Sequence, residues 1–175
     1  MADYGRDITT TGYAREIPLG NFLSSFHEDL SREFPDWEDL LMLSMDAQGM
    51  PLGLAFSVRT PNPYRILSLN VNASEQPPVV RIEFNGAMEE FSGSFEAVRY
   101  LRFIVNEEIV CISRFINSEF QSCWMAEPGR ALSAVSTQDS KPAGCMSFLQ
   151  PAREESLRVT SWTGRLDDMD QFHRG

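Results

Sequence analysis

The chain has 175 residues, of which 42% are hydrophobic and 23% are charged. This composition is typical of a protein that folds around its own apolar core, and it excludes a chain that is disordered or fibrous throughout. The 25 acidic residues outnumber the 15 basic ones and give a net charge of −10. Such a field repels nucleic acid and anionic membranes and favours basic partners, although solubility alone accounts for the acidity equally well. We expect one globular domain over residues 1–175 that binds neither nucleic acid nor membrane.

The N-terminal stretch MADYGRDITTTGYARE contains acids and lacks the apolar run of about 7 to 15 residues that a secretory signal needs. No run along the chain reaches the roughly 18 apolar residues of a membrane-spanning helix. The sequence therefore predicts a cytoplasmic protein, of the acidic kind that is common in bacteria.

Segment 18–34 repeats large apolar side chains every four positions, which predicts an amphipathic helix. These side chains are Phe22, Phe26, Leu30 and Phe34. Asn21 is the expected N-cap of this helix, and Pro35 is its expected stop.

Five apolar or alternating runs separated by turn residues follow this helix, and they predict five consecutive antiparallel strands. They cover residues 40–45, 52–58, 66–72, 79–84 and 87–91. Between the last two, Asn85-Gly86 predicts a type I′ turn, because both of its central positions need a positive φ. If Phe84 pairs with Ala87, Arg81 faces Glu90 across the hairpin.

The same register puts Glu89 on the otherwise apolar face of this hairpin. We favour the interpretation that Glu89 guards an edge strand against edge-to-edge aggregation, a device that natural sheets use often. A binding role is the second interpretation. A role as catalytic acid comes last, because no partner acid or histidine can be placed beside it.

Helical spacing returns over residues 92–107, and the apolar residues 109–112 suit a central strand that is covered on both faces. Strands are also expected at 119–125 and 156–162, and a helical turn in the tail. Together these elements predict an α+β fold: a mostly antiparallel sheet of about six to eight strands with two main helices packed on one face. The segment at about 127–155 has little periodicity and is expected to be a poorly ordered or functional loop.

Three cysteines, an odd number, argue against a disulfide framework. If Ile116 pairs with Glu119, Cys111 faces Trp124 and the sulfurs of Cys111 and Cys123 point to opposite faces of the sheet. We expect both to be buried structural thiols. The sequence does not indicate whether Cys145 is exposed.

Motifs of catalysis and cofactor binding are absent from the sequence. The glycine pairs 49/53 and 86/93 have neither of the spacings that cradle phosphate, and GxSxG does not occur. A Cys–His enzyme would depend on His27 or His173, which lie on a helix and near the chain end. Asp170 and His173 could hold a metal ion if they were one helical turn apart, but a solvated acidic tail is favoured. We expect no catalytic residue, metal or cofactor.

The most charged segment is HEDLSREFPDWEDL, residues 27–40, which is called the acidic stretch below. It places an aromatic residue among acids, and interfaces combine aromatic anchors with charged rims. The candidate partner-binding residues are Glu28, Asp29, Glu33, Asp36, Trp37, Glu38 and Asp39. The competing interpretation is a solvated helix face with Trp37 folded back onto the core.

The order of elements resembles that of type III secretion chaperones and of many immunity proteins that neutralise toxins, an analogy that cannot carry function alone. Our first hypothesis is a non-enzymatic immunity or inhibitor protein, monomer or homodimer, that covers a basic site on a toxin or nuclease. A homodimeric secretion chaperone that binds an extended cargo segment is the alternative. A third hypothesis is a small metal-dependent hydrolase that uses Asp167, Asp168, Asp170 or Cys145.

Overall fold

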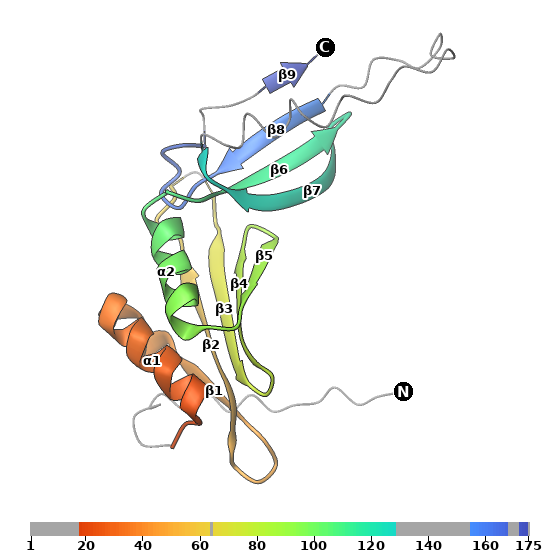
Figure 1. The fold of residues 1–175 in the computed structure, drawn as a ribbon. Coiled ribbons are helices and arrows are strands. Elements are labelled where there is room, and N and C mark those ends of the chain that lie inside the picture. Colours follow the sequence, from red (N-terminus) through yellow and green to blue (C-terminus); the bar gives the residue numbers. More distant parts are fainter. Residues whose placement is uncertain (1–17, 64, 129–154, 168–171, 175) are drawn as a thin grey trace, which may run out of the picture. The chain divides into compact units, whose positions relative to one another are not determined.

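Figure 1 shows the computed structural model of the chain, which describes residues 18–63, 65–128, 155–167 and 172–174. The helices are α1 (Asn21–Glu33), the short 3-10 helix η1 (Pro35–Leu40) and α2 (Ser94–Val105). The strands are β1 (Met42–Met45), β2 (Pro51–Arg59), β3 (Ser68–Glu75), β4 (Pro78–Phe84), β5 (Ala87–Phe91), β6 (Val110–Ile116), β7 (Glu119–Ala126), β8 (Glu155–Thr160) and β9 (Phe172–Arg174). The predicted α+β fold, with antiparallel strands and two main helices, is confirmed.

Contacts divide the chain into two compact units. The first unit combines residues 1–59, 68–83 and 89–102, and the second combines residues 60–67, 84–88 and 103–175. The expected single domain stays a prediction. Most of the expected loop at 127–155 lies outside the described residues. No helix in the described part of the chain is long and apolar enough to cross a bilayer.

The five strands predicted between residues 40 and 91 form one sheet in the order β1-β2-β3-β4-β5, so each strand lies beside its neighbour in sequence. The turn between β4 and β5 has φ values of 51° at Asn85 and 85° at Gly86, as a type I′ turn requires. Arg81 Nε lies 2.6 Å from Glu90 Oε1, which confirms that these side chains face each other. The Asn-Gly signal is local, and it correctly placed the hairpin.

Burial in the first unit follows the periodicity of its elements. On β3, Leu69, Val71 and Ala73 are buried, while the alternate residues Asn70 and Asn72 are not. Helix α1 packs on β3 and completely buries Leu23, Phe26 and Leu30. Burial of a side chain of this size stabilises the fold by roughly 1.5 to 3 kcal/mol. The amphipathic stripe therefore attaches α1 to the sheet.

A second sheet, in the order β7-β6-β8-β9, lies in the second unit. Its central strand β6 buries the successive residues Val110, Cys111 and Ile112 completely, so both of its faces are covered, as predicted. Val110 and Ile112 form an apolar cluster with Leu157 and Val159 of β8. The sequence did not indicate that the strands would divide between two sheets.

The prediction that Cys111 and Cys123 point to opposite faces is wrong. Ile116 pairs with Glu119 as expected, but the register shifts between Arg114 and Phe115. Beyond this bulge Cys111 pairs with Met125 and Cys123 with Ser113. Because residues two apart on a strand share a face, both sulfurs point to the same face. Burial raises the pKa of the Cys111 thiol to about 11, which fits an unreactive structural cysteine.

The tail has a turn at 164–167, closed by a 3.2 Å hydrogen bond from the Asp167 amide to the Gly164 carbonyl, and a strand near its end. Residues 172–174 form β9, which pairs with β8 so that His173 lies opposite Ser156. His173 therefore lies on a strand and not on a helix, so the predicted helical spacing between it and Asp170 is wrong. Asp170 itself lies outside the described residues. Among the described residues, no cluster of three or more metal-ligating side chains occurs.

Candidate functional site

The acidic stretch runs along the second half of α1 and through η1, in the first unit. Three of its acids lie beside a polar residue of the same unit. Asp29 accepts a 2.8 Å hydrogen bond from Ser94 Oγ, Glu33 lies 3.6 Å from Arg102, and Glu38 lies 3.9 Å from His27. The hydrogen bond of Asp29 links α1 to the start of α2, whereas the other two contacts are longer than a hydrogen bond. Glu28, Asp36 and Asp39 are exposed.

Trp37 packs against other aromatic side chains. Its ring stacks on Phe34 with centroids 4.1 Å apart and lies 5.7 Å from the ring of Phe56 on β2. Phe56 is buried, so Trp37 contacts the core of the unit while it remains half-buried itself. This packing matches the competing interpretation of the sequence. A role for Trp37 as a binding anchor stays a prediction.

Exposed apolar side chains lie at the end of η1 and on the β1–β2 hairpin that follows it, and sequence reasoning missed them. They are Leu40, Met42, Met45, Met50 and Leu52, called the methionine hairpin below, and each is at least 37% exposed. Three of the eight methionines of the chain fall between residues 42 and 50. That concentration was the available signal, because methionine is common at adaptable binding surfaces.

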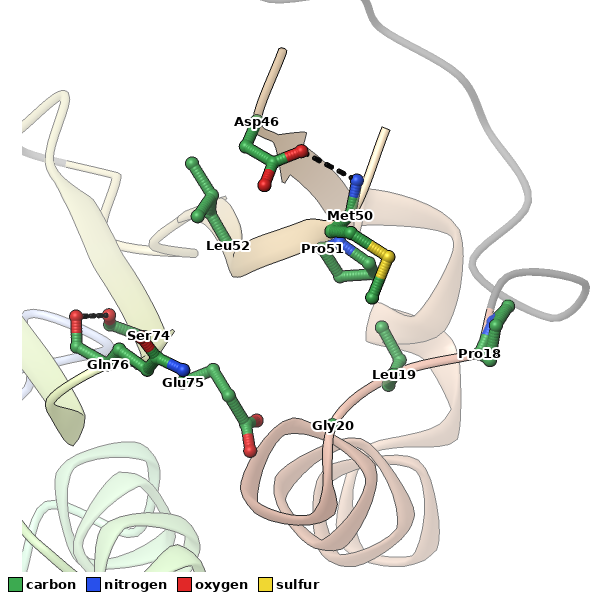
Figure 2. Close-up of a pocket in the computed structure, with 10 residues that line it drawn as sticks. All are labelled: Pro18, Leu19, Gly20, Asp46, Met50, Pro51, Leu52, Ser74, Glu75 and Gln76. Carbon is green, nitrogen blue, oxygen red and sulfur yellow. Dashed lines mark hydrogen bonds between the residues drawn. The ribbon is translucent and has the colours of Figure 1, made fainter. Parts of the chain in front are cut away.

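A pocket of ≈ 830 Å³ lies between the start of α1, the β1–β2 turn and the end of β3 (Figure 2). Its apolar wall consists of Pro18, Leu19, Met50, Pro51 and Leu52. Two carboxylates also line it, and both bind backbone amides. Asp46 Oδ1 accepts hydrogen bonds of 2.9 and 2.8 Å from the amides of Gln48 and Met50. The described lining therefore offers apolar contacts, with its acids already engaged.

The second carboxylate of the pocket, Glu75, caps helix α1. Its two oxygens accept hydrogen bonds of 3.3 and 3.0 Å from the amides of Phe22 and Leu23. The N-cap residue is Gly20, which makes no side-chain hydrogen bond, so the expected N-cap at Asn21 is wrong. A Cβ atom at Gly20 would overlap the Glu75 carboxyl group. Gly20 thus leaves the space that a distant acid occupies.

Replacing Glu75 with alanine should lower the free energy of unfolding by about 1 kcal/mol, the usual effect of losing a cap. Gly20→Ala should have a similar effect, because its new methyl group displaces the carboxylate. The double variant should lose less than the sum, since no carboxylate remains to be displaced. Urea denaturation of the three variants, with Glu83→Gln on β4 as control, measures this coupling. Additive losses would show that the two residues act independently.

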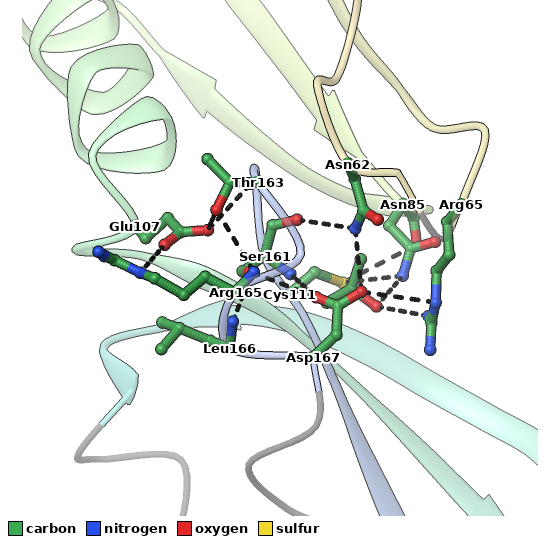
Figure 3. A network of polar contacts seen from close by, with 11 residues as sticks. Asn62, Arg65, Asn85, Glu107, Cys111, Ser161, Thr163, Arg165, Leu166 and Asp167 are labelled. Atoms are coloured by element: carbon green, nitrogen blue, oxygen red, sulfur yellow. Dashed lines mark hydrogen bonds and ion pairs between the residues drawn. The ribbon is translucent and has the colours of Figure 1, made fainter.

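A network of polar contacts in the second unit fixes the loop after β8 (Figure 3). At its centre is Asp167, whose side chain is 6% exposed. Its Oδ1 accepts hydrogen bonds from the amide and the hydroxyl of Ser161, at 2.7 and 3.2 Å. Its Oδ2 accepts one from Asn62 Nδ2 at 2.9 Å and lies 3.6 Å from Arg65 Nε. This carboxylate ties the segment 60–67 to the loop 161–167.

Glu107, at the end of α2, holds the other side of the same loop. Its carboxylate accepts hydrogen bonds from the amide and hydroxyl of Thr163, at 2.9 and 2.6 Å, and from Arg165 Nε at 3.1 Å. Burial raises the pKa of Glu107, whereas the hydrogen bonds from Thr163 and Ser161 and the charge of Arg165 lower it. The lowering effects are larger together, so the pKa lies below its usual value of 4.5. The charged form is therefore the stable one in the folded protein.

These contacts bear on the hydrolase hypothesis. The Asp167 carboxylate accepts three hydrogen bonds from Ser161 and Asn62 and lies beside Arg65, so it has a structural role in the described network. The hydrolase hypothesis stays a prediction. Cys145, Asp168 and Asp170, the other residues of that hypothesis, lie outside the described residues. Comparisons of this chain with protein-family models, with curated proteins and with solved structures found no match.

Proposed function

We propose that this chain is a non-enzymatic protein-binding protein whose acidic stretch covers a basic site on a partner protein, in the manner of an immunity or inhibitor protein. The observation that carries the proposal is the adjacency of two exposed surfaces in sequence and fold. The exposed acids Asp36 and Asp39 of η1 lead directly into the methionine hairpin. Interfaces combine an apolar centre with a charged rim, and the rim acids speed the encounter with a basic partner.

The composition of the two surfaces defines the partner that fits. A basic protein gains from a net charge of −10, and its association rate should fall as salt screens the field. Apolar groups on the partner should meet the methionines, whose flexible side chains adapt to different shapes. A toxin with a cationic active site, such as a nuclease, has this chemistry.

Charge reversal tests the proposal. We expect Asp36→Lys with Asp39→Lys to slow association with the partner by about tenfold at low salt, because four units of charge change at the rim. Glu83→Lys with Glu119→Lys is the matched control, since it makes the same change in net charge at exposed positions on β4 and β7. The partner is first isolated by pull-down at low and high salt, and rates are then measured by surface plasmon resonance. Equal rates for both variants would contradict the proposal.

Trp37→Ala is a poor probe of binding. Because Trp37 stacks on Phe34 and contacts Phe56, its removal should destabilise the first unit whether or not it touches a partner. The exposed acids of η1 are better probes, since exposed charges contribute little to stability.

A further inference from the structure

The two edges of the five-stranded sheet differ in charge. Edge strand β5 has the sequence AMEEF, exposes Glu89 and Glu90, and pairs Glu90 with Arg81 on β4. Edge strand β1 has the sequence MLSM and contains no charged residue. Natural sheets protect their edge strands against the addition of a foreign strand with charges, with short length or with bulges. Strand β5 carries charges, whereas β1 is short and bulged but uncharged, so charge does not repel a short added segment from β1.

Strand β1 is open to an added strand in the described part of the chain, where β2 is its single neighbour. Met42, Ser44 and Met45 of β1 are exposed. The outer side of an edge strand presents backbone N–H and C=O groups that can pair with an extended peptide, and exposed side chains add specificity. The bulge between Ser44 and Met45 limits the regular pairing to a few residues.

The charges around β1 select among the possible occupants. Asp39 precedes the strand and Asp46 follows it, so both ends carry a carboxylate. A second copy of the chain would bring these acids together across a two-fold axis, against a net charge of −10 on each copy. An extended segment with alternating apolar residues and with lysine or arginine meets acids at both ends of the strand.

We propose that β1 accepts an extended apolar and basic segment of the partner protein as an added strand of the sheet. This inference rests on the proposed function and names the kind of segment that the site takes. It also explains why the methionines are exposed beside the strand: they cover the side chains of the added segment. The acids of η1 then contact its basic residues.

The first experiment uses the full chain and a capped peptide in which valine and lysine alternate. Its control is the same peptide with every second amide N-methylated, which keeps the charge and the side chains but removes the donors needed for strand pairing. We expect the methylated peptide to bind at least about tenfold more weakly. Hydrogen exchange should slow at alternate amides of Met42–Met45 and stay unchanged in β5. Equal affinity for the two peptides, or no binding of the unmethylated one, would overturn the proposal.

The second experiment separates this proposal from the proposed function. Met42→Ser with Met45→Ser removes the apolar cover of the added strand without changing the charge, and should weaken peptide binding severalfold, whereas binding by charge alone would be unchanged. Met88→Ser on edge strand β5 is the control. Unchanged binding to the double variant would overturn strand addition beside the methionines and leave an acidic surface. If the peptide bound the double methionine variant more weakly but bound the Asp36→Lys, Asp39→Lys variant as tightly as the unchanged protein, strand addition would be supported and the role of the acidic rim refuted.

Two further outcomes identify other occupants. Alternate amides of β1 bond to β2 and are protected in any case, so the amides that face away from β2 decide the result. If these outward-facing amides are already protected in the free monomer, another part of the chain covers β1 and the proposal fails. If sedimentation shows a dimer that Met42→Glu with Met45→Glu dissociates, a second copy occupies the edge, which also overturns it. A monomer with rapidly exchanging outward-facing amides supports an edge that is open for a partner.

Discussion

Replacing Asp167 with alanine should lower the free energy of unfolding by about 3 kcal/mol. The loss comes mainly from the amide of Ser161, which would lose its acceptor, and from Asn62 Nδ2, which would lose its 2.9 Å bond and keep the longer one of 3.4 Å to the Ser161 carbonyl. An unsatisfied buried donor costs about 1 to 3 kcal/mol. Arg65 adds less, because its side chain is 38% exposed and water can replace the carboxylate. Urea denaturation measures the change.

Two variants make this result specific. Asp167→Asn keeps the shape and one acceptor oxygen, so its loss should be smaller than that of alanine. Glu90→Gln breaks an ion pair of 2.6 Å whose side chains are 54% and 50% exposed, and it should cost less than about 1 kcal/mol. If Glu90→Gln destabilised the protein as much as Asp167→Ala, burial would not decide the strength of these contacts.

The second large effect is a dependence of stability on pH through Glu107. Because the folded pKa is lowered below 4.5, the charged carboxylate contributes stability that is fully present above about pH 6 and is lost as pH falls through the folded pKa. Glu107→Gln should therefore cost about 2 kcal/mol at pH 7 and progressively less below pH 4.5. Unfolding by urea over a pH series measures this difference.

The control for Glu107 is Glu108→Gln, because Glu108 is its exposed neighbour and should change stability little at any pH. A difference between the protein and Glu107→Gln that stayed constant from neutral to acid pH would contradict the assigned charge. In that case the loss of stability in Glu107→Gln would come from the changed shape of the side chain, because the stability of both proteins would change with pH in the same way.

Local signals were the reliable part of the sequence. The four-residue repeat of α1 and the Asn85-Gly86 turn depend on residues that are neighbours in the chain, and the structure has both. The five strands between residues 42 and 91 were also predictable, because turn residues separate clear apolar runs.

Long-range contacts were not predictable. The cap of α1 comes from Glu75, which is 53 residues from Phe22 in the sequence. The residues near the start of the helix instead predicted a local N-cap at Asn21. The bulge at Gln121 turns Cys123 to the other face of the sheet, and no glycine or proline in the sequence indicates it. The buried role of Asp167 depends on Asn62 and Ser161, which only the fold brings together.

The candidate site divides in the same way. Charge patterning located the acidic stretch, but it could not distinguish Asp29, which accepts a hydrogen bond from Ser94, from the exposed Asp36 and Asp39. The open edge of β1 was invisible in the sequence, because strand order decides which strand has a free side.

The cap that Glu75 provides also has a consequence for synthesis on the ribosome. Helix α1 leaves the exit tunnel before β3, yet the amides of Phe22 and Leu23 lack their carboxylate acceptor until β3 has been made and placed beside the helix. An isolated helix of 13 residues is marginal in water, so α1 should remain only partly formed while β1 and β2 emerge. The helix becomes fully stable only when the chain has reached the end of β3. Helix α1 is thus synthesised well before the residue that completes it.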